Sequence, residues 1–459
     1  MNDSLQITLQ PQQPLQTLTG FGASACWWSP QVSDAATRDD LLRRLYGKDG
    51  LALNIYRYNV GGGVNPAHER VTDAWRLTES FLTADKNGGW TYDFSRDANA
   101  QAALFKALSF GCVDTVVLFA NSPHYSMTVS GESSGHMAAG VCNLRKDCFQ
   151  AFVDYFLTVT EYFLSKGVPV KYISPINEPQ WSWGGEVRQE GCHYEPEDVI
   201  ALLHLFAEGI EARALNVKLT APESGEIGER TQEYFSRIAD DALLLRHIGS
   251  FSYHSYWQDD NPAIKAAFGD WYAAQPYAKI PLEMSEWCEL PNQHATTDPM
   301  AAALMAGVIA DDLRESRPNS WTAWVAVNAE CIHEDGKDYS DGLFSAAHDF
   351  SRYSESYRYS ALGHFSKFIP AGAVQIPCTA SAAIPATLHL FAALRPDGTC
   401  VLVAANCGAA QKVQFTAPFL RRTVFLTDET HRLACIGSAD GDALLLPACS
   451  VVTILFTKA

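Results

Sequence analysis

The sequence predicts an α/β protein, a (β/α)8 TIM barrel with an attached β-sandwich domain. Apolar strand-like runs alternate with segments of helical periodicity through most of the 459 residues, and eight strand–helix units can be counted. No Gly-rich phosphate turn follows the first run, as an open doubly wound sheet would favour. Beyond about residue 370 the helical pattern stops, and short strands with turn signals follow. A barrel followed by an all-β domain accounts for all three observations.

The barrel strands are predicted where apolar, β-branched runs end at polar residues. These runs are 20–28, 51–60, 115–120, 170–176, 218–223, 251–257, 280–287 and 321–327. Helices are predicted where apolar residues recur at helical spacing, over 32–47, 95–110, 144–166, 196–214, 230–245, 299–316 and 353–366. We therefore place the catalytic barrel in residues 19–367.

A β-domain is predicted over residues 368–459. A hairpin is expected around Arg395-Pro-Asp-Gly398, and strands are expected at 387–394, 399–405, 411–416, 422–427 and 450–457. Residues 1–18 contain one strand without a nearby partner, in which Leu5, Ile7 and Leu9 alternate with polar residues. Because such strands must bury one face, we expect residues 1–18 to complete the β-sandwich against the barrel.

Composition narrows the class of partner. The chain is 47% hydrophobic and 19% charged, with a formal net charge of −18, which disfavours nucleic acid and anionic membranes as partners. The 12 cysteines include no CxxC pair, so we expect free thiols in a reducing compartment. The first twenty residues lack a secretory pattern, and no stretch is apolar enough to span a membrane. We therefore expect a cytoplasmic protein with a neutral or weakly charged ligand.

Two predicted strands end in a glutamate beside tryptophan. The run at 170–176 stops at Asn177-Glu178-Pro179 with Trp181 close behind, and the run at 280–287 ends at Glu286-Trp287. Taken alone, Glu178 is explained as a helix cap, and for either glutamate alone a solvent-facing loop residue is the favoured interpretation. In a closed parallel barrel, however, both would lie at the edge where active sites form. A carboxyl pair can cleave a glycosidic bond, because one group protonates the leaving oxygen while the other attacks or activates water.

Further polar and aromatic residues fall at predicted strand ends. They are Arg57, Asn121, Asn177, His254, Tyr256 and Trp324. His254 and Tyr256 share one face of their strand, so both can point into the site, although a satisfied core histidine is the alternative for His254. Arg57 requires an anionic partner, either Glu286 or a structural acid.

Two other glutamates compete for the role of Glu286. Glu283 lies three residues before it, and regular strand alternation places Glu283 on the opposite face. Glu289 follows the end of the strand. No HExxH motif or paired histidines occur, and Cys192-His193 lacks ligand spacing, so we expect neither a metal nor a cofactor.

With these residues the chain resembles glycoside hydrolase family 30, whose members are retaining glycosidases with a (β/α)8 barrel and a β-sandwich. The resemblance runs nearly end to end. It rests on Gly20-Phe-Gly22, Asn54-Ile-Tyr-Arg-Tyr-Asn59, Asn121-Ser-Pro123, Asn177-Glu-Pro179, Ser285-Glu-Trp287 and the stretch from Ala361 to Pro370. It implies that Glu178 is the acid/base, that Glu286 is the nucleophile and that Asn177 holds the 2-hydroxyl group. It also implies that the sugar site contains Arg57, Asn121, Trp181, Glu190, His254, Tyr256 and Trp324.

Within that family, the stretch from Gln189 to His193 resembles the branch that contains β-1,6-galactanases. The resemblance therefore implies a retaining β-glycosidase whose partner is a β-linked galactosyl oligosaccharide. β-Glucosidase, β-fucosidase or xylanase specificity is the alternative within the same fold. A sugar-binding barrel without turnover is the alternative of another class.

Overall fold

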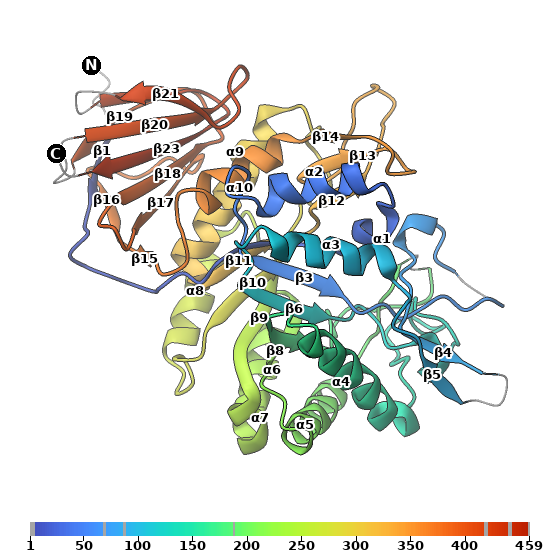
Figure 1. The fold of residues 1–459 in the computed structure, drawn as a ribbon. Coiled ribbons are helices and arrows are strands. Elements are labelled where there is room, and N and C mark those ends of the chain that lie inside the picture. The colour runs from blue at the N-terminus through green and yellow to red at the C-terminus, as the bar shows by residue number, and fades with distance from the viewer. Residues whose placement is uncertain are drawn as a thin grey trace.

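The computed structural model describes residues 5–67, 70–85, 89–186, 189–416, 421–438 and 443–457. Residues 1–4 and 458–459, which the sequence analysis assigns to the β-domain, lie outside the described residues. A helix-covered barrel and a β-domain of two larger sheets lie next to each other (Figure 1). Strand β1 at the start of the chain belongs to the β-domain (Figure 1).

Eight strands close into a barrel in the order β10-β11-β2-β3-β6-β7-β8-β9. They are β2 (Gly20–Ser24), β3 (Ile55–Asn59), β6 (Thr115–Phe119), β7 (Val170–Ser174), β8 (Lys218–Glu226), β9 (Ile248–Tyr256), β10 (Leu282–Glu286) and β11 (Ser320–Ala323). All neighbouring pairs are parallel. The predicted TIM barrel is confirmed.

Helices follow the barrel strands and cover the outside of the barrel (Figure 1). They are α1 (Trp28–Gln31), α2 (Ala35–Tyr46), α3 (Ala98–Ser109), α4 (Phe149–Ser165), α5 (Pro196–Ala212), α6 (Glu229–Asp240), α7 (Ala242–His247), α8 (Pro262–Ala273), α9 (Pro299–Asp311) and α10 (Tyr357–Ser366). Helix α8 was not predicted, although Asn261 caps it and Pro262 begins it, which are both helix-start signals. The first predicted strand ends early, at Ser24, because Trp28 begins α1.

The β-domain consists of a four-stranded sheet, β16-β1-β19-β22, and a six-stranded sheet, β15-β17-β18-β23-β20-β21. Its strands are β1 (Leu5–Leu9), β15 (Val374–Gln375), β16 (Cys378–Ala380), β17 (Leu388–Leu394), β18 (Cys400–Asn406), β19 (Gln411–Thr416), β20 (Arg421–Thr427), β21 (Ala434–Ser438), β22 (Ala443–Leu446) and β23 (Ser450–Thr457). Leu5, Ile7 and Leu9 are buried with Leu402 and Ile454 in the core between the sheets. The N-terminal strand β1 therefore packs within the C-terminal β-domain, where it pairs with β16 and β19.

The six-stranded sheet also packs against barrel helices. Phe391 and Val403 belong to the same hydrophobic core as the barrel residues, and His389 Nδ1 lies 2.8 Å from Asp311 Oδ2 at the end of α9. The ring of buried His364 in α10 is hydrogen-bonded to hydroxyl groups of the β-domain. One face of the six-stranded sheet thus belongs to the core of the barrel, while the core between the two sheets is separate.

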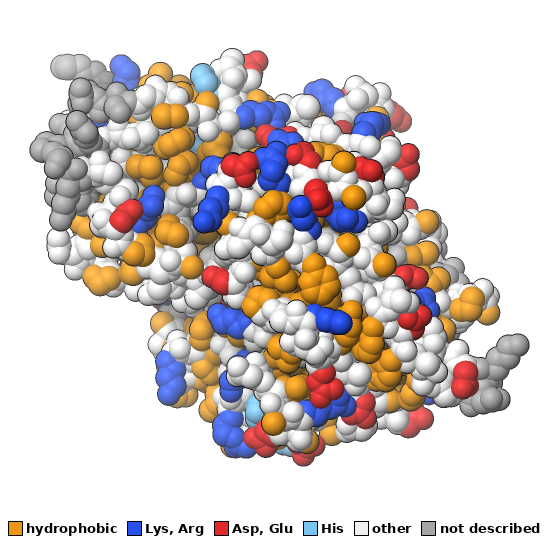
Figure 2. Space-filling view, viewed as in Figure 1, with side chains coloured by type: hydrophobic (Ala, Val, Ile, Leu, Met, Phe, Trp, Pro, Cys, Tyr) orange, Lys and Arg blue, Asp and Glu red, His pale blue; other side chains and the backbone are white. Residues whose placement is uncertain are grey.

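Smaller sheets extend the loops around the barrel. They are β4 (Leu82–Ala84) with β5 (Trp90–Tyr92), and β12 (Val327–Ala329) with β13 (Phe344–Ala346) and β14 (Tyr353–Glu355). Among the described helices, none has the length and apolar character needed to cross a bilayer. Figure 2 shows acidic and basic side chains intermingled over one face of the molecule.

Candidate active site

A cavity of about 660 Å³ opens at the ends of the barrel strands. Seven of the predicted site residues line it: Asn121, Asn177, Glu178, Trp181, Tyr256, Glu286 and Trp324. Arg57 and His254 are fully buried behind its wall and contact its carboxylates. The fold therefore brings nine of the ten predicted residues to one place.

The tenth residue, Glu190, does not line the cavity. Its carboxylate accepts hydrogen bonds from Asn59 Nδ2 at 3.0 Å and from the backbone N–H of Gly62 at 2.9 Å. Glu190 is therefore placed to join the loop after β7 to the end of β3. A contact between Glu190 and a sugar stays a prediction.

Glu286 enters the barrel because β10 carries a bulge. Ser252 and His254 are two residues apart on β9, but their partners on β10, Glu283 and Glu286, are three apart, and the register shifts between Met284 and Glu286. Both glutamates therefore point to the same side, and the expectation that Glu283 faces away was wrong. Glu283 lies deeper in the barrel, where burial raises its pKa to about 7.

Two donors from other barrel strands, β3 and β9, hold the Glu286 carboxylate. Arg57 Nη1 donates to Oε2 at 2.8 Å, and the Tyr256 hydroxyl donates to Oε1 at 3.1 Å. Burial raises the pKa of Glu286, while the nearby charges of His254 and Arg57 oppose that rise. Arg57 also lies 3.5 Å from Glu223, so both partners foreseen for it, Glu286 and a structural acid, are present.

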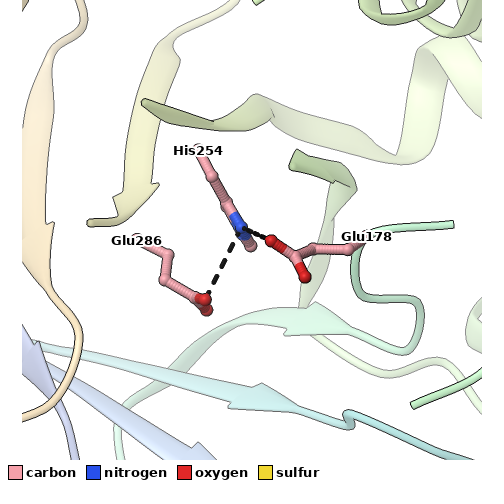
Figure 3. A group of neighbouring side chains, drawn as sticks. All are labelled: Glu178, His254 and Glu286. Carbon is pink, nitrogen blue, oxygen red and sulfur yellow. Dashed lines mark hydrogen bonds and ion pairs between the residues drawn. The ribbon is translucent and has the colours of Figure 1, made fainter. Parts of the chain in front are cut away.

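Glu178 lies in the loop after β7 and is held by fewer contacts. Its backbone has φ +45°, and its N–H donates to the carbonyl of Glu223 at 2.9 Å. His254 Nδ1 lies 2.9 Å from Glu178 Oε1 and 3.6 Å from Glu286 Oε1, so the imidazole ring sits beside both carboxylates (Figure 3). Both glutamates therefore share one histidine.

Glu223 at the far side of His254 is a site residue that the sequence analysis missed. Its Oε2 lies 3.1 Å from His254 Nε2, and its carboxylate also accepts hydrogen bonds from Ser174 and Ser285. Burial alone would raise the pKa of Glu223, but the charge of Arg57 and the bond with His254 lower it to about 2. A glutamate at the end of the predicted strand 218–223 was the available signal, but no tryptophan lies next to it.

The three carboxylates keep His254 protonated. Burial alone would lower its pKa, but the charge of Glu286 and the bonds with Glu178 and Glu223 raise the pKa of His254 to about 10. Glu178, His254 and Glu286 each offer a ligand atom within 4.8 Å of the others, a spacing that could hold a metal ion. Both ring nitrogens of His254 already lie within hydrogen-bond distance of carboxylates, Nδ1 of Glu178 and Nε2 of Glu223, as in a proton network.

Asn177 presents an unused acceptor. Its Oδ1 is buried and has no hydrogen-bond partner among the described residues. A buried polar atom without a partner costs free energy unless a ligand satisfies it. Asn177 directly precedes Glu178 and lines the cavity, so a sugar hydroxyl could complete its bonding.

Glu289, the other rival of Glu286, is engaged elsewhere. It bonds His294 Nδ1 at 2.6 Å and forms a buried ion pair with Arg358. It does not line the cavity. Residues that line it and were not predicted include Trp27, Trp257, Glu226 and Asp341. Trp27 and Trp257 lie in the predicted runs 20–28 and 251–257 but were not assigned to the site, and Glu226 and Asp341 lie outside those runs.

The sequence of this chain matches a family model. Residues 4–344 match the model described as O-glycosyl hydrolase family 30. The chain is 25% identical over 235 residues to an endo-β-1,6-galactanase of Hypocrea rufa, covering 46% of this chain and 47% of that protein. It is 24% identical over 254 residues to an exo-β-1,6-galactobiohydrolase of Bifidobacterium longum subsp. longum, covering 43% of this chain and 16% of that protein. The chain thus spans less than half the length of these relatives.

A solved structure is similar over the whole chain. The crystal structure of a conserved exported protein from Bacteroides fragilis aligns with a TM-score of 0.85 and 22% sequence identity, covering 98% of this chain and 99% of that one. At this identity the likeness concerns the fold.

Proposed function

The chain belongs to O-glycosyl hydrolase family 30 and is a glycoside hydrolase, and from this premise we propose that it is a retaining β-glycosidase for β-linked galactosyl oligosaccharides. In this proposal Glu178 is the acid/base and Glu286 is the nucleophile. The remaining residues of the cavity bind the sugar or hold the two carboxyl groups in position.

The observation that carries this proposal is the closeness of the two carboxylates. Oxygens of Glu178 and Glu286 lie within 4.8 Å of each other in one cavity. Retaining enzymes place their carboxyl groups roughly 5–5.5 Å apart, whereas inverting enzymes leave about 6.5–9.5 Å for a water molecule. The separation therefore supports covalent catalysis.

The proposed reaction has two steps. Glu286 Oε attacks the anomeric carbon while Glu178 donates its proton to the glycosidic oxygen, so the bond to the leaving sugar breaks as the bond to Glu286 forms. Glu178, now ionised, then removes a proton from water, and the water oxygen displaces Glu286 from the anomeric carbon. Glu178 ends the cycle protonated again, and the sugar is released with its original β configuration.

The contacts support this assignment of roles. Glu286 accepts hydrogen bonds from Arg57 and Tyr256, which stabilise a carboxylate, whereas among the described residues the Glu178 carboxyl is hydrogen-bonded to His254 alone. Burial raises the pKa of Glu286, which alone would favour Glu286 as the acid. Arg57 and Tyr256 both donate to Glu286, however, so when the two neighbouring carboxyls share one proton, these bonds favour the proton on Glu178.

The β-1,6-galactosyl specificity is supported by the names of the two relatives that match part of the chain. A rate panel tests it, with aryl β-galactoside, β-glucoside, β-fucoside and β-xyloside beside β-1,6-galactobiose. We expect galactosyl substrates to give the highest kcat/KM. A preference for glucoside, fucoside or xyloside would contradict the proposed galactosyl specificity but would leave the proposed mechanism unchanged.

Covalent catalysis is tested with a 2-fluoro β-glycoside of the preferred sugar. We expect stoichiometric labelling, with the label on Glu286 in a peptide digest. Absence of both labelling and turnover on every glycoside would favour a sugar-binding barrel.

A further inference from the structure

Trp257 has a conformation that packing does not explain. It directly follows β9, its backbone has φ +64°, and 55% of its surface is exposed. Left-handed backbone is an outlier for a bulky residue, and an exposed indole recovers little free energy from burial. The ring nevertheless lines the cavity. This combination indicates a ligand contact at the cavity mouth.

Trp181 forms a second wall next to Trp257. The two ring centroids are 6.5 Å apart and the rings are perpendicular, at 89°. The Trp181 indole lies against bare backbone, since a Cβ at Gly225 would come within 2.1 Å of Trp181 Nε1 and 3.0 Å of Glu178 Oε1. The Trp181 ring is therefore fixed beside the Glu178 carboxyl, and Trp257 extends this wall toward solvent.

A different pair of tryptophans lies on the Glu286 side. Trp27 and Trp324 meet edge to face at 5.0 Å, and Trp324 lies 6.0 Å from the guanidinium of Arg57, which binds Glu286. The nucleophile attacks the glycone, and the acid protonates the oxygen of the leaving sugar. The wall beside Glu178 is therefore on the leaving-group side of the scissile bond.

We propose that Trp257 and Trp181 form the binding platform for the leaving-group sugar, and that the half-buried carboxylate of Glu226 accepts hydrogen bonds from its hydroxyls. The C–H face of a pyranose packs on one indole, and the perpendicular ring closes the corner. Glu226 lines the same cavity and pairs with Tyr256 in the barrel register. This inference rests on the proposed function and adds where the second sugar binds.

The test compares two substrates that share a glycone and differ in the leaving group. The leaving group of β-1,6-galactobiose is a sugar that can contact the platform. The leaving group of β-galactosyl fluoride is a single fluoride ion that cannot. For Trp257→Ala we expect the ratio of kcat/KM on the disaccharide to kcat/KM on the fluoride to fall roughly 10–100-fold, the range expected for a lost aromatic contact. Trp257→Phe keeps a ring and should recover most of the ratio.

Trp90→Ala is the matched control. Trp90 is also a partly exposed tryptophan, at 38%, but it lies in β5 and does not line the cavity. Its ratio should equal that of the wild type. A ratio unchanged in Trp257→Ala, or a Trp257→Phe variant no better than Trp257→Ala, would overturn the platform.

The inference and the proposed function fail in different ways. If the wild type cleaves a β-glucosyl or β-xylosyl fluoride in place of the galactosyl one, the same ratio is measured with that sugar and its disaccharide. If the wild type cleaves no glycosyl fluoride, both the proposed function and the platform are contradicted. If the fluoride is cleaved and the ratio does not respond, only the platform falls.

Discussion

The two sides of the cavity are built differently. Glu286 ends a barrel strand and is held by Arg57 and Tyr256, which belong to β3 and β9. Glu178 lies beyond the end of β7 and has a left-handed backbone conformation. It belongs to the same loop as Trp181. The proposed nucleophile is thus positioned by the barrel itself, whereas the proposed acid/base and the tryptophans beside it depend on loops. Changes on the Glu286 side should affect every substrate, and changes on the Glu178 side should depend on the leaving group.

The largest effect is expected from removing the two carboxylates separately. Glu286→Ala should lower kcat/KM by a factor of at least about 10⁴ on all substrates, because no covalent intermediate can form. Glu178→Ala should lose about 10²–10⁴-fold on a disaccharide, the usual contribution of a general acid, but much less on a glycosyl fluoride. Steady-state kinetics on both substrates measure this difference.

The anomer formed with azide tests the assignment of the acid/base role to Glu178 and of the nucleophile role to Glu286. Added to Glu178→Ala, it should give a β-glycosyl azide, because it enters the face that the missing base leaves open while Glu286 still holds the sugar. An α-azide from this variant would reverse the two roles. NMR of the product distinguishes the two anomers.

The next effect concerns Glu223, which joins the two sides through His254. Its pKa, lowered to about 2, means that its stabilising contribution is present above its ordinary pKa and is lost as pH falls through about 2. The raised pKa of His254 contributes stability below about pH 6.5 that is lost as pH rises through about 10. Glu223→Gln removes one negative neighbour, so the pKa of His254 falls, and an alkaline loss of kcat/KM that follows deprotonation of His254 should begin roughly one pH unit lower.

Glu289→Gln is the control for that experiment. Glu289 is also buried and also bonds a histidine and an arginine, His294 and Arg358, but away from the cavity. Both variants should unfold at lower temperature, because each leaves a buried arginine with one anionic partner fewer. Only Glu223→Gln should shift the pH profile. An equal shift in both would mean that the effect comes from lost stability.

A smaller effect is expected at Tyr256. Its hydroxyl donates to Glu286, and a hydrogen bond to a charged group contributes about 1.5–3 kcal/mol. Tyr256→Phe should therefore lower kcat/KM by roughly 10–150-fold, equally on the disaccharide and the fluoride, since the nucleophile serves both. Tyr46→Phe, which loses a buried hydrogen bond to the carbonyl of Ala23, should leave both rates unchanged. A loss of kcat/KM on the disaccharide alone would indicate that Tyr256 contacts the leaving group and does not act through Glu286.

The sequence predicted the Glu286 side better than the Glu178 side, and the difference has a physical reason. Arg57, His254 and Tyr256 lie on strands that the apolar pattern locates, and parallel barrels gather strand ends at one edge. Strand alternation nevertheless failed at Glu283, because the bulge near Ser285 inserts one residue, and a bulge leaves no reliable mark in a single sequence.

The loop side depends on long-range contacts that no local pattern contains. Glu190 was expected at the sugar, but its carboxylate bonds Asn59 and the backbone of Gly62, far away in the chain. Trp257 lies one residue beyond the predicted Tyr256, and only its backbone conformation and exposure distinguish it from a core tryptophan. Helix α8, by contrast, carried start signals at Asn261 and Pro262 and could have been found.

The smallest effect on kcat/KM is expected at His193, which contacts the backbone of Trp181. Its Nδ1 lies 2.9 Å from the backbone carbonyl of Trp181, and as an N–H it donates to that oxygen. A hydrogen bond of this kind contributes about 0.5–1.5 kcal/mol, so His193→Ala should lower kcat/KM on the disaccharide by roughly 2–10-fold. The loss on a glycosyl fluoride should be smaller, because Glu178 is held by His254 and by the backbone of Glu223 rather than by this bond. An equal loss on both substrates would show that the loop also positions Glu178, and the two sides of the cavity would then not be independent.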